Sequence, residues 1–265
     1  MSTVLQISDT HFGTERPSVV EALVGLAGQQ QPDLVVLSGD ITQRARATEF
    51  RSARAFVDRL GIPVLAIPGN HDIPLFDIWM RLRAPYARYT DAFGSELEPV
   101  HASHDLMVVC VNTTRSWRHK NGEISDDQID RVAALFADAG DTQLRVVVVH
   151  QPVAVTRAED VQNQLRGHTT ALRRWSTAGV DLVLGGHIHL PYVLEVHGLA
   201  RPMWAVQAGT AVSSRVRKGA PNSVNLLRWH VETSQRTCQI EQWDYSDAEQ
   251  AFVGGAVTKV CPARG

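Results

Sequence analysis

The sequence predicts an α/β fold, and three observations support that prediction. Short β-branched runs alternate with longer amphipathic stretches along most of the chain, as expected for strands alternating with helices. The 265-residue chain is 44% hydrophobic and 20% charged, a composition typical of globular domains. Polar clusters rich in histidine and aspartate directly follow several of the strand-like runs. In such folds the strands are buried on both faces, and ligands bind at their carboxyl ends.

The individual elements follow from hydrophobic periodicity. Apolar β-branched runs predict strands, and stretches with apolar residues three or four positions apart predict helices. In chain order we expect a strand at 4–7, a helix at 19–29, a strand at 34–37, a helix at 48–60, and strands at 64–67 and 106–111. A helix at 125–139, a strand at 144–149, a helix at 161–177 and a strand at 182–184 follow. Beyond them only strands are expected, at 192–196, 203–207, 224–229 and 236–243.

The chain is expected to form a single domain over 1–265, with an all-β C-terminal portion at 192–245. No Gly/Ser linker, internal repeat or low-complexity tract divides it. The segment 74–99 is aromatic and irregular, and it predicts one helix followed by a loop. Two interpretations of this segment stay open: a cap over a functional site, or a surface insertion packed by its own aromatic side chains.

Charge and cysteine content argue against several classes of protein. The net charge of −2 does not support binding of polymeric nucleic acid or an anionic membrane through bulk positive charge. No apolar run approaches the roughly 18 residues that a membrane-spanning helix needs, and no secretory signal is visible. The three cysteines, Cys110, Cys238 and Cys261, lack the spacing of a thiolate metal site or a disulfide framework. We therefore expect a cytoplasmic protein without a membrane span.

Five short clusters contain the candidate functional residues. They are Asp9-Thr10-His11, Gly39-Asp40, Gly69-Asn70-His71-Asp72, His150 and Gly186-His187-Ile188-His189. If an Asp-x-His or His-x-His triplet continues a strand, its first and third side chains point to the same side. Carboxylate, amide and imidazole ligands without thiolate suit Mn, Fe, Zn or Co. Two aspartates, one asparagine and four histidines are too many ligands for one ion, but they fit two ions that share a bridging carboxylate.

The order of these clusters resembles the calcineurin-like metallophosphoesterase superfamily. The block Ile7-Ser8-Asp9-Thr10-His11-Phe12 is similar to its bacterial branch of class III cyclic nucleotide phosphodiesterases and glycerophosphodiesterases. The resemblance implies a four-layer α-β-β-α sandwich of two mixed β-sheets flanked by helices. It also implies one metal site made of Asp9, His11, Asp40 and His189. The second site would be made of Asp40, Asn70, His150 and His187, with Asp40 bridging.

The same resemblance implies that His71 lies beside the phosphate and that Asp72 orients it. Two ions about 3.5–4 Å apart can hold a bridging hydroxide and polarise phosphoryl oxygens, so attack on phosphorus is in line. A protonated His71 would stabilise the developing charge or donate a proton to the leaving alkoxide. Alternatively, Asp72 caps the segment that opens at Pro74, and His187 and His189 are structural histidines of a half-buried strand.

A basic run at 115–120 follows the strand expected at 106–111. Arg115, Arg118 and His119 are candidates for binding a distal phosphate or carboxylate of the substrate; the alternative is a solvated turn closed by Asn121-Gly122. The sequence departs from the family pattern at Asn112, where the family has Asp, and at Gln151, where it has His. Neither change removes a metal ligand, but both alter the pocket floor.

The sequence thus predicts an enzyme, a phosphoesterase with two divalent metal ions per chain. Its expected substrate is a small-molecule phosphodiester, either a cyclic nucleotide such as cyclic AMP or a glycerophosphodiester. The alternatives are a nucleotide-sugar or lipid pyrophosphatase, a phosphomonoesterase, and a non-catalytic metal-binding scaffold. The HxHxDH cluster of binuclear lactonases and amidohydrolases is absent. The sequence leaves a homodimer open.

Overall fold

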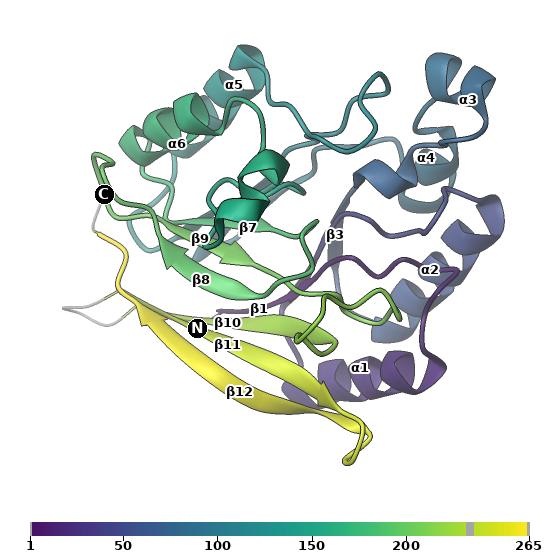
Figure 1. Ribbon diagram of the computed structural model, residues 1–265. Coiled ribbons are helices and arrows are strands. Elements are labelled where there is room, and N and C mark those ends of the chain that lie inside the picture. The colour runs from purple at the N-terminus through teal and green to yellow at the C-terminus, as the bar shows by residue number, and fades with distance from the viewer. Residues whose placement is uncertain (1, 232–235, 264–265) are drawn as a thin grey trace.

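Two six-stranded β-sheets face each other, and helices cover their outer faces (Figure 1). The computed structural model describes residues 2–231 and 236–263. The strand orders are β12-β11-β10-β1-β2-β3 in the first sheet and β4-β5-β6-β7-β9-β8 in the second. Both sheets are mixed, so the predicted α/β four-layer sandwich is confirmed.

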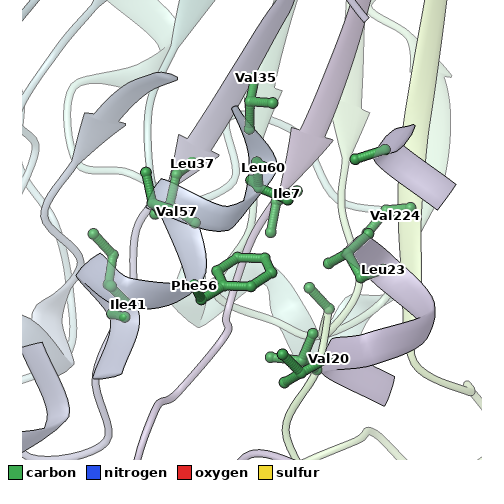
Figure 2. Close-up of a cluster of buried hydrophobic side chains, with 14 of the residues drawn as sticks. Ile7, Val20, Leu23, Val35, Leu37, Ile41, Phe56, Val57, Leu60 and Val224 are labelled. Carbon is green, nitrogen blue, oxygen red and sulfur yellow. The ribbon is translucent and has the colours of Figure 1, made fainter. Parts of the chain in front are cut away.

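The first sheet joins the start of the chain to its end. Its strands are β1 (Ser2–Ile7), β2 (Leu34–Ser38), β3 (Val64–Ile67), β10 (Ser223–Val231), β11 (Arg236–Ser246) and β12 (Ala251–Val260). β1, β2 and β3 are parallel, whereas β10, β11 and β12 add in antiparallel order. The crossover helices α1 (Pro17–Gln30) and α2 (Ala47–Leu60) pack on its outer face. Figure 2 shows Phe56 of α2 and Leu23 of α1 pointing at Ile7 of β1 in this core.

The second sheet is built from the middle of the chain. Its strands are β4 (Val100–Ala102), β5 (Leu106–Cys110), β6 (Leu144–Val148), β7 (Leu182–Gly185), β8 (Tyr192–Glu195) and β9 (Trp204–Gln207). The four central strands are parallel and the two edge strands antiparallel. Helices α5 (Asp126–Ala137) and α6 (His168–Thr177) cover the outer face, and a second core fills the space between the sheets.

The helix expected at 161–177 begins only at His168. Residues Ala158–Asn163 form a separate 3₁₀ helix, η2, and the chain turns before α6. Gly167 makes that turn with φ 87°, and an added Cβ there would lie 2.9 Å from Cγ2 of Ile124. The apolar periodicity continues across the break, and for this reason the sequence suggested one helix.

The segment 74–99 forms two short helices instead of one helix and a loop. They are α3 (Ile78–Arg83) and α4 (Ala87–Phe93). Pro85 separates them, since a proline disfavours the helical conformation in the residue before it. Tyr89 of α4 is buried and its hydroxyl donates to the backbone oxygen of Ala66 at 2.8 Å, whereas α3 has no buried residue.

Two strands were not expected from the sequence, the short edge strand β4 and the long edge strand β12. β12 carries the all-β C-terminal region beyond the predicted limit of 245 to Val260. All of its residues from Val253 to Val257 are exposed, so they lack the alternating pattern that predicts a half-buried strand. Within the described residues, no helix is long and apolar enough to cross a membrane.

Candidate metal centre

The predicted clusters meet where the parallel strands of both sheets end. Asp9 follows β1, Asp40 follows β2, and Asn70 opens the 3₁₀ turn η1 (Asn70–Asp72) after β3. From the second sheet, His150 follows β6, and the pair His187 and His189 follows β7. Both sheets thus point their carboxyl ends at one place, which is the usual location of ligand sites in α/β folds.

The backbone of these residues is not a continuation of the strands. Asp9, His11, Asp40, His187 and His189 have φ values of 52°, 42°, 48°, 73° and 56°. Residues other than glycine rarely adopt this left-handed backbone conformation, which costs of the order of 1–3 kcal/mol per residue. The expectation that strand periodicity aligns the Asp-x-His and His-x-His triplets is therefore wrong. Left-handed residues after the strand ends bring the side chains together instead.

One group of side chains gathers around Asp9. The Nε2 atom of His189 lies 3.2 Å from Oδ1 of Asp9 and 3.2 Å from Nε2 of His11. The distance from His11 Nε2 to Asp9 Oδ1 is 3.8 Å. These three residues offer ligand atoms close enough together to hold a metal ion.

A second group gathers around Asp40. His150 Nε2 lies 3.3 Å from Oδ1 of Asp40, and His187 belongs to the same group. The other oxygen, Oδ2 of Asp40, lies 3.8 Å from His11 Nε2, so this carboxylate stands between the two groups. His150 fits closely because its neighbour Gly39 has no side chain: an added Cβ would lie 2.4 Å from Nδ1 of His150.

Unpartnered polar atoms indicate that these groups are built for a cation. Asn70 Oδ1 and both ring nitrogens of His187 are buried without a hydrogen bond from any described residue. Such an atom costs about 1–3 kcal/mol when nothing binds it. In contrast, Nδ1 of His150 donates to the backbone oxygen of Ser38 at 2.9 Å, and Nδ1 of His189 donates to that of Arg215. These bonds leave the Nε2 lone pairs for a metal, as in known metal-binding histidines.

The protonation states of the cluster fit the same interpretation. Burial lowers the pKa of His11 and of His187 to about 3, so both rings are neutral. Burial alone would also lower the pKa of His150, but the carboxylate of Asp40 raises it to about 9. Against the effect of burial, His189 lowers the pKa of Asp9 to about 2. The centre thus holds ionised carboxylates, and a divalent cation can replace the proton on His150.

Asp72 does not form the expected contact that would orient His71. Nδ1 of His71 donates to the backbone oxygen of Gln43 at 2.9 Å, and its Nε2 lies 3.3 Å from Nη1 of Arg215. Adjacent residues of a 3₁₀ turn point about 120° apart, so the Asp72 carboxylate faces the other way. Its oxygens accept the backbone N–H groups of Ile41, Thr42 and Gly69. Asp72 therefore fixes the loop that carries Asp40 and does not orient His71.

The basic run lies at the edge of the centre, but its two arginines bond within the protein. Arg115 donates to the backbone oxygens of Asn112 and Thr114 and to the side chain of Gln128. Arg118 forms an ion pair with Glu123. His119 shares a hollow with Asn70 and His71.

Cations that the sequence analysis did not select also lie here. Lys120 lines a hollow together with His187, His189 and Arg215. Arg215 follows no strand-end motif, and it belongs to the site because the long loop between β9 and β10 folds back over His189. Lys120 is the next residue after the predicted His119, so the basic run itself was a usable signal.

Comparisons with known proteins bear on the family of the chain. A family model described as calcineurin-like phosphoesterase matches residues 2–191. The chain is 29% identical over 170 residues to the glycerophosphodiester phosphodiesterase GpdQ of Enterobacter lignolyticus, a match that spans 58% of each protein. It is 24% identical over 204 residues to a probable cyclic nucleotide phosphodiesterase of Synechococcus, covering 72% of this chain and 74% of the relative.

Among solved structures, a dimetal phosphatase from Danio rerio superposes with a TM-score of 0.70 at 14% identity, over 99% of both chains. At this identity the likeness supports the fold alone. The sequence match supplies the family, so the resemblance inferred from the five motifs is confirmed.

Proposed function

The chain belongs to the calcineurin-like phosphoesterase family, and from this membership we propose that it hydrolyses a small-molecule phosphodiester with the help of two divalent metal ions. The observation that carries the proposal is the buried donor set around Asp40. It combines two carboxylates, four imidazoles and an amide oxygen, and several of these atoms have no other partner among the described residues.

We assign the ligands to two sites on the basis of these contacts and the family pattern. Asp9, His11 and His189 would hold one ion, and Asn70, His150 and His187 the other, with Asp40 shared between them. Mn, Fe, Zn and Co suit this mixture of oxygen and imidazole ligands. When bound, the ions would supply Lewis-acid polarisation of the phosphoryl oxygens and an activated water.

The remaining side chains bind and orient the phosphate. His71 lies with Arg44 and His119 around a hollow of about 160 Å³ that begins at Asn70. Its Nδ1 proton is held by the backbone oxygen of Gln43, so Nε2 is the atom that exchanges a proton with the substrate. The guanidinium of Arg215, 3.3 Å from that Nε2, places a permanent positive charge where charge develops on the phosphoryl group.

A phosphodiester is favoured over other esters because two relatives point to that class. One is named a glycerophosphodiester phosphodiesterase and the other a probable cyclic nucleotide phosphodiesterase. The match to the first spans 58% of its length, so its substrate is not transferred to this chain. We propose that the enzyme acts in the cytoplasm, as either a monomer or a homodimer.

Parallel kinetics test this function. The metal-free protein is loaded with Mn, Zn or Fe and assayed with bis(p-nitrophenyl) phosphate, p-nitrophenyl phosphate, cyclic AMP and a glycerophosphodiester. We expect metal-dependent cleavage of the diesters, and kcat/KM for bis(p-nitrophenyl) phosphate well above that for the monoester. A strong preference for the monoester would overturn the diesterase assignment, and failure of the metal-loaded protein on all four esters would favour a non-catalytic scaffold.

A further inference from the structure

Helix α3 turns its apolar side chains away from the protein. Phe76, Ile78, Trp79 and Leu82 are between 65% and 73% exposed, and Leu75 is 41% exposed. We call these five residues the α3 surface. In Figure 1, α3 lies at the periphery of the molecule, above α4. Exposed apolar residues that gather in this way, and are not scattered singly, mark a binding surface.

Helix α3 exposes its apolar face and turns a charged side chain toward the protein, the reverse of an ordinary amphipathic surface helix. Its Arg81 points inward and donates to the backbone oxygens of Pro74 and Arg118. Ile78 and Leu82, four residues apart on one face of the helix, point to solvent together with Trp79. A surface helix normally buries the apolar face and exposes the charge. The inward arginine anchors α3 and leaves the apolar face open.

The α3 surface is continuous with the proposed phosphate site. Leu75 and Phe76 line the same hollow as Asn70 and His71. The hydrogen bond from Arg81 to Arg118 ties α3 to the basic loop that carries His119 on the other side of that hollow. A molecule with its phosphate beside His71 would therefore meet apolar side chains directly outside the site.

Cations flank this apolar surface. The guanidinium of Arg44 lies over the ring of Phe76 at 5.4 Å, and that of Arg83 lies over the ring of Trp79 at 5.1 Å. A ligand that fits here has an apolar chain and an anionic group at one end, since both kinds of contact are offered next to each other.

We propose that the substrate is an amphiphilic phosphodiester whose apolar chain lies on the α3 surface. This inference rests on the proposed phosphodiesterase function and specifies the substrate class. Hydrolysis adds water across one P–O ester bond: the phosphorus gains the water oxygen, the leaving alcohol takes a proton, and a phosphomonoester remains. The apolar chain stays outside the reacting centre and contributes binding alone.

A homologous series of alkyl p-nitrophenyl phosphates tests the proposal, because its members share the phosphodiester and the leaving group. Each fully buried methylene favours binding about fourfold, and a half-buried one about twofold. The hexyl ester should thus exceed the methyl ester about 30-fold in kcat/KM, mainly through KM. The esters are used below the concentration at which they form micelles.

Two variants locate the effect. Trp79→Ser should lower kcat/KM for the hexyl ester more than for the methyl ester, and so flatten the dependence on chain length. Val257→Ser is the matched control, because Val257 is 62% exposed on the remote edge strand β12. It should retain the full dependence on chain length. Unchanged thermal unfolding of both variants shows that the fold is intact.

The outcomes separate this inference from the function on which it rests. If no ester of the series is cleaved, the phosphodiesterase function fails. If all are cleaved with equal kcat/KM, the function stands and the amphiphile proposal is overturned. The proposal is also overturned if Trp79→Ser dissociates a dimer in sedimentation while the dependence on chain length persists, because the surface then binds a second copy of the chain.

Discussion

Two clusters of buried polar residues lie at opposite ends of β7, and they differ in how their charges are compensated. At the carboxyl end, the metal centre contains unpartnered buried atoms, and several of its residues are left-handed, including Asp9 and His187. At the amino end, Asp181 accepts the backbone N–H of Arg145 at 2.9 Å and Nη2 of Arg236 at 3.1 Å. None of these three residues has a positive φ, and the unpartnered buried atoms in this cluster are the Nε donors of Arg145 and Arg236, which cannot bind a cation.

The difference separates residues that serve function from residues that serve the fold. In the Asp181 cluster, carboxylate and guanidinium groups of the chain compensate each other's charge. Removing the Asp181 carboxylate would leave a buried cation and lower the free energy of unfolding. The metal centre contains strained left-handed residues and buried lone pairs without a hydrogen bond. Both features lower the stability of the metal-free protein. Function explains why such costs persist. Substitutions in the first cluster should therefore affect catalysis, and substitutions in the second should affect stability.

The largest expected effect is the loss of catalysis on changing Asn70 or His71. Asn70→Ala removes the unpartnered oxygen that we propose as a metal ligand, and His71→Ala removes the imidazole that we propose lies beside the phosphate. Both should lower kcat by about two to four orders of magnitude, the range for a lost general acid or electrostatic stabiliser. Elemental analysis should find one metal equivalent fewer in Asn70→Ala, whereas His71→Ala keeps both.

Stability provides the second half of this test. Denaturant unfolding of the metal-free Asn70→Ala protein should give a free energy of unfolding no lower than that of the metal-free wild type, because the lost oxygen made no hydrogen bond to a described residue. Equal metal content in the two variants would contradict the division of roles between them.

The next largest effect is expected at the other end of β7. Asp181→Ala leaves the buried guanidinium of Arg236 without its carboxylate, and breaking such a pair costs about 3–5 kcal/mol. The free energy of unfolding should fall by this amount, measured with urea at pH 7. Specific activity under native conditions should stay within about twofold of wild type. A loss of kcat comparable to that of the metal-centre variants would remove the distinction between the clusters.

A pH dependence of stability should distinguish Asp181 from an ordinary surface carboxylate. Burial raises its pKa to about 6, although Arg236 opposes the shift, whereas an unfolded Asp titrates near about 3.9. Between these values the folded protein binds more protons than the unfolded chain. The part of the stabilising contribution that depends on protonation is thus complete below about pH 4 and is lost as the pH rises through 6, and above that pH only the pairing of the carboxylate with Arg236 contributes.

The variant Asp181→Asn does not titrate and serves as the reference. The difference in unfolding free energy, wild type minus Asp181→Asn, should decrease by up to about 3 kcal/mol between pH 4 and pH 8, because one pKa unit corresponds to about 1.4 kcal/mol. The measurement uses urea unfolding at each pH with chelator present, so that metal binding does not vary. A difference that stays constant would show that Asp181 has an unshifted pKa.

The sequence predicted the structure correctly where the local residue pattern alone determines it. The apolar runs of β1, β2, β5 and β6 are buried on both faces, and the five polar clusters follow strands as the α/β pattern requires. It failed where tertiary contacts decide conformation. Nothing local distinguishes Gly167, whose turn depends on close contact with Ile124, from a glycine within a helix.

At the site, too, the residue types could be predicted from the sequence, whereas the conformation could not. The types and order of the candidate ligands were visible in the sequence, but the left-handed backbone that brings their side chains together was not. The direction of the Asp72 side chain depends on the turn that holds it, so its bonds to the loop after β2 could not be inferred from sequence. Arg215 lies far along the chain from every motif, and only the path of the β9–β10 loop brings it to His71.

The smallest expected effect is a change in KM on removing a cation of the basic run, where one cation is paired and another is not. Arg118 is held by Glu123, whereas Lys120 faces the hollow beside His187 and His189 and forms no ion pair with a described residue. Lys120→Ala should therefore raise KM for an anionic diester by at most about fivefold, since an exposed charge contributes up to about 1 kcal/mol. Arg118→Ala should change KM less. The effect of Lys120→Ala should diminish in high salt, which screens exposed charges; a larger effect from Arg118→Ala would mean that the Glu123 pair opens when substrate binds.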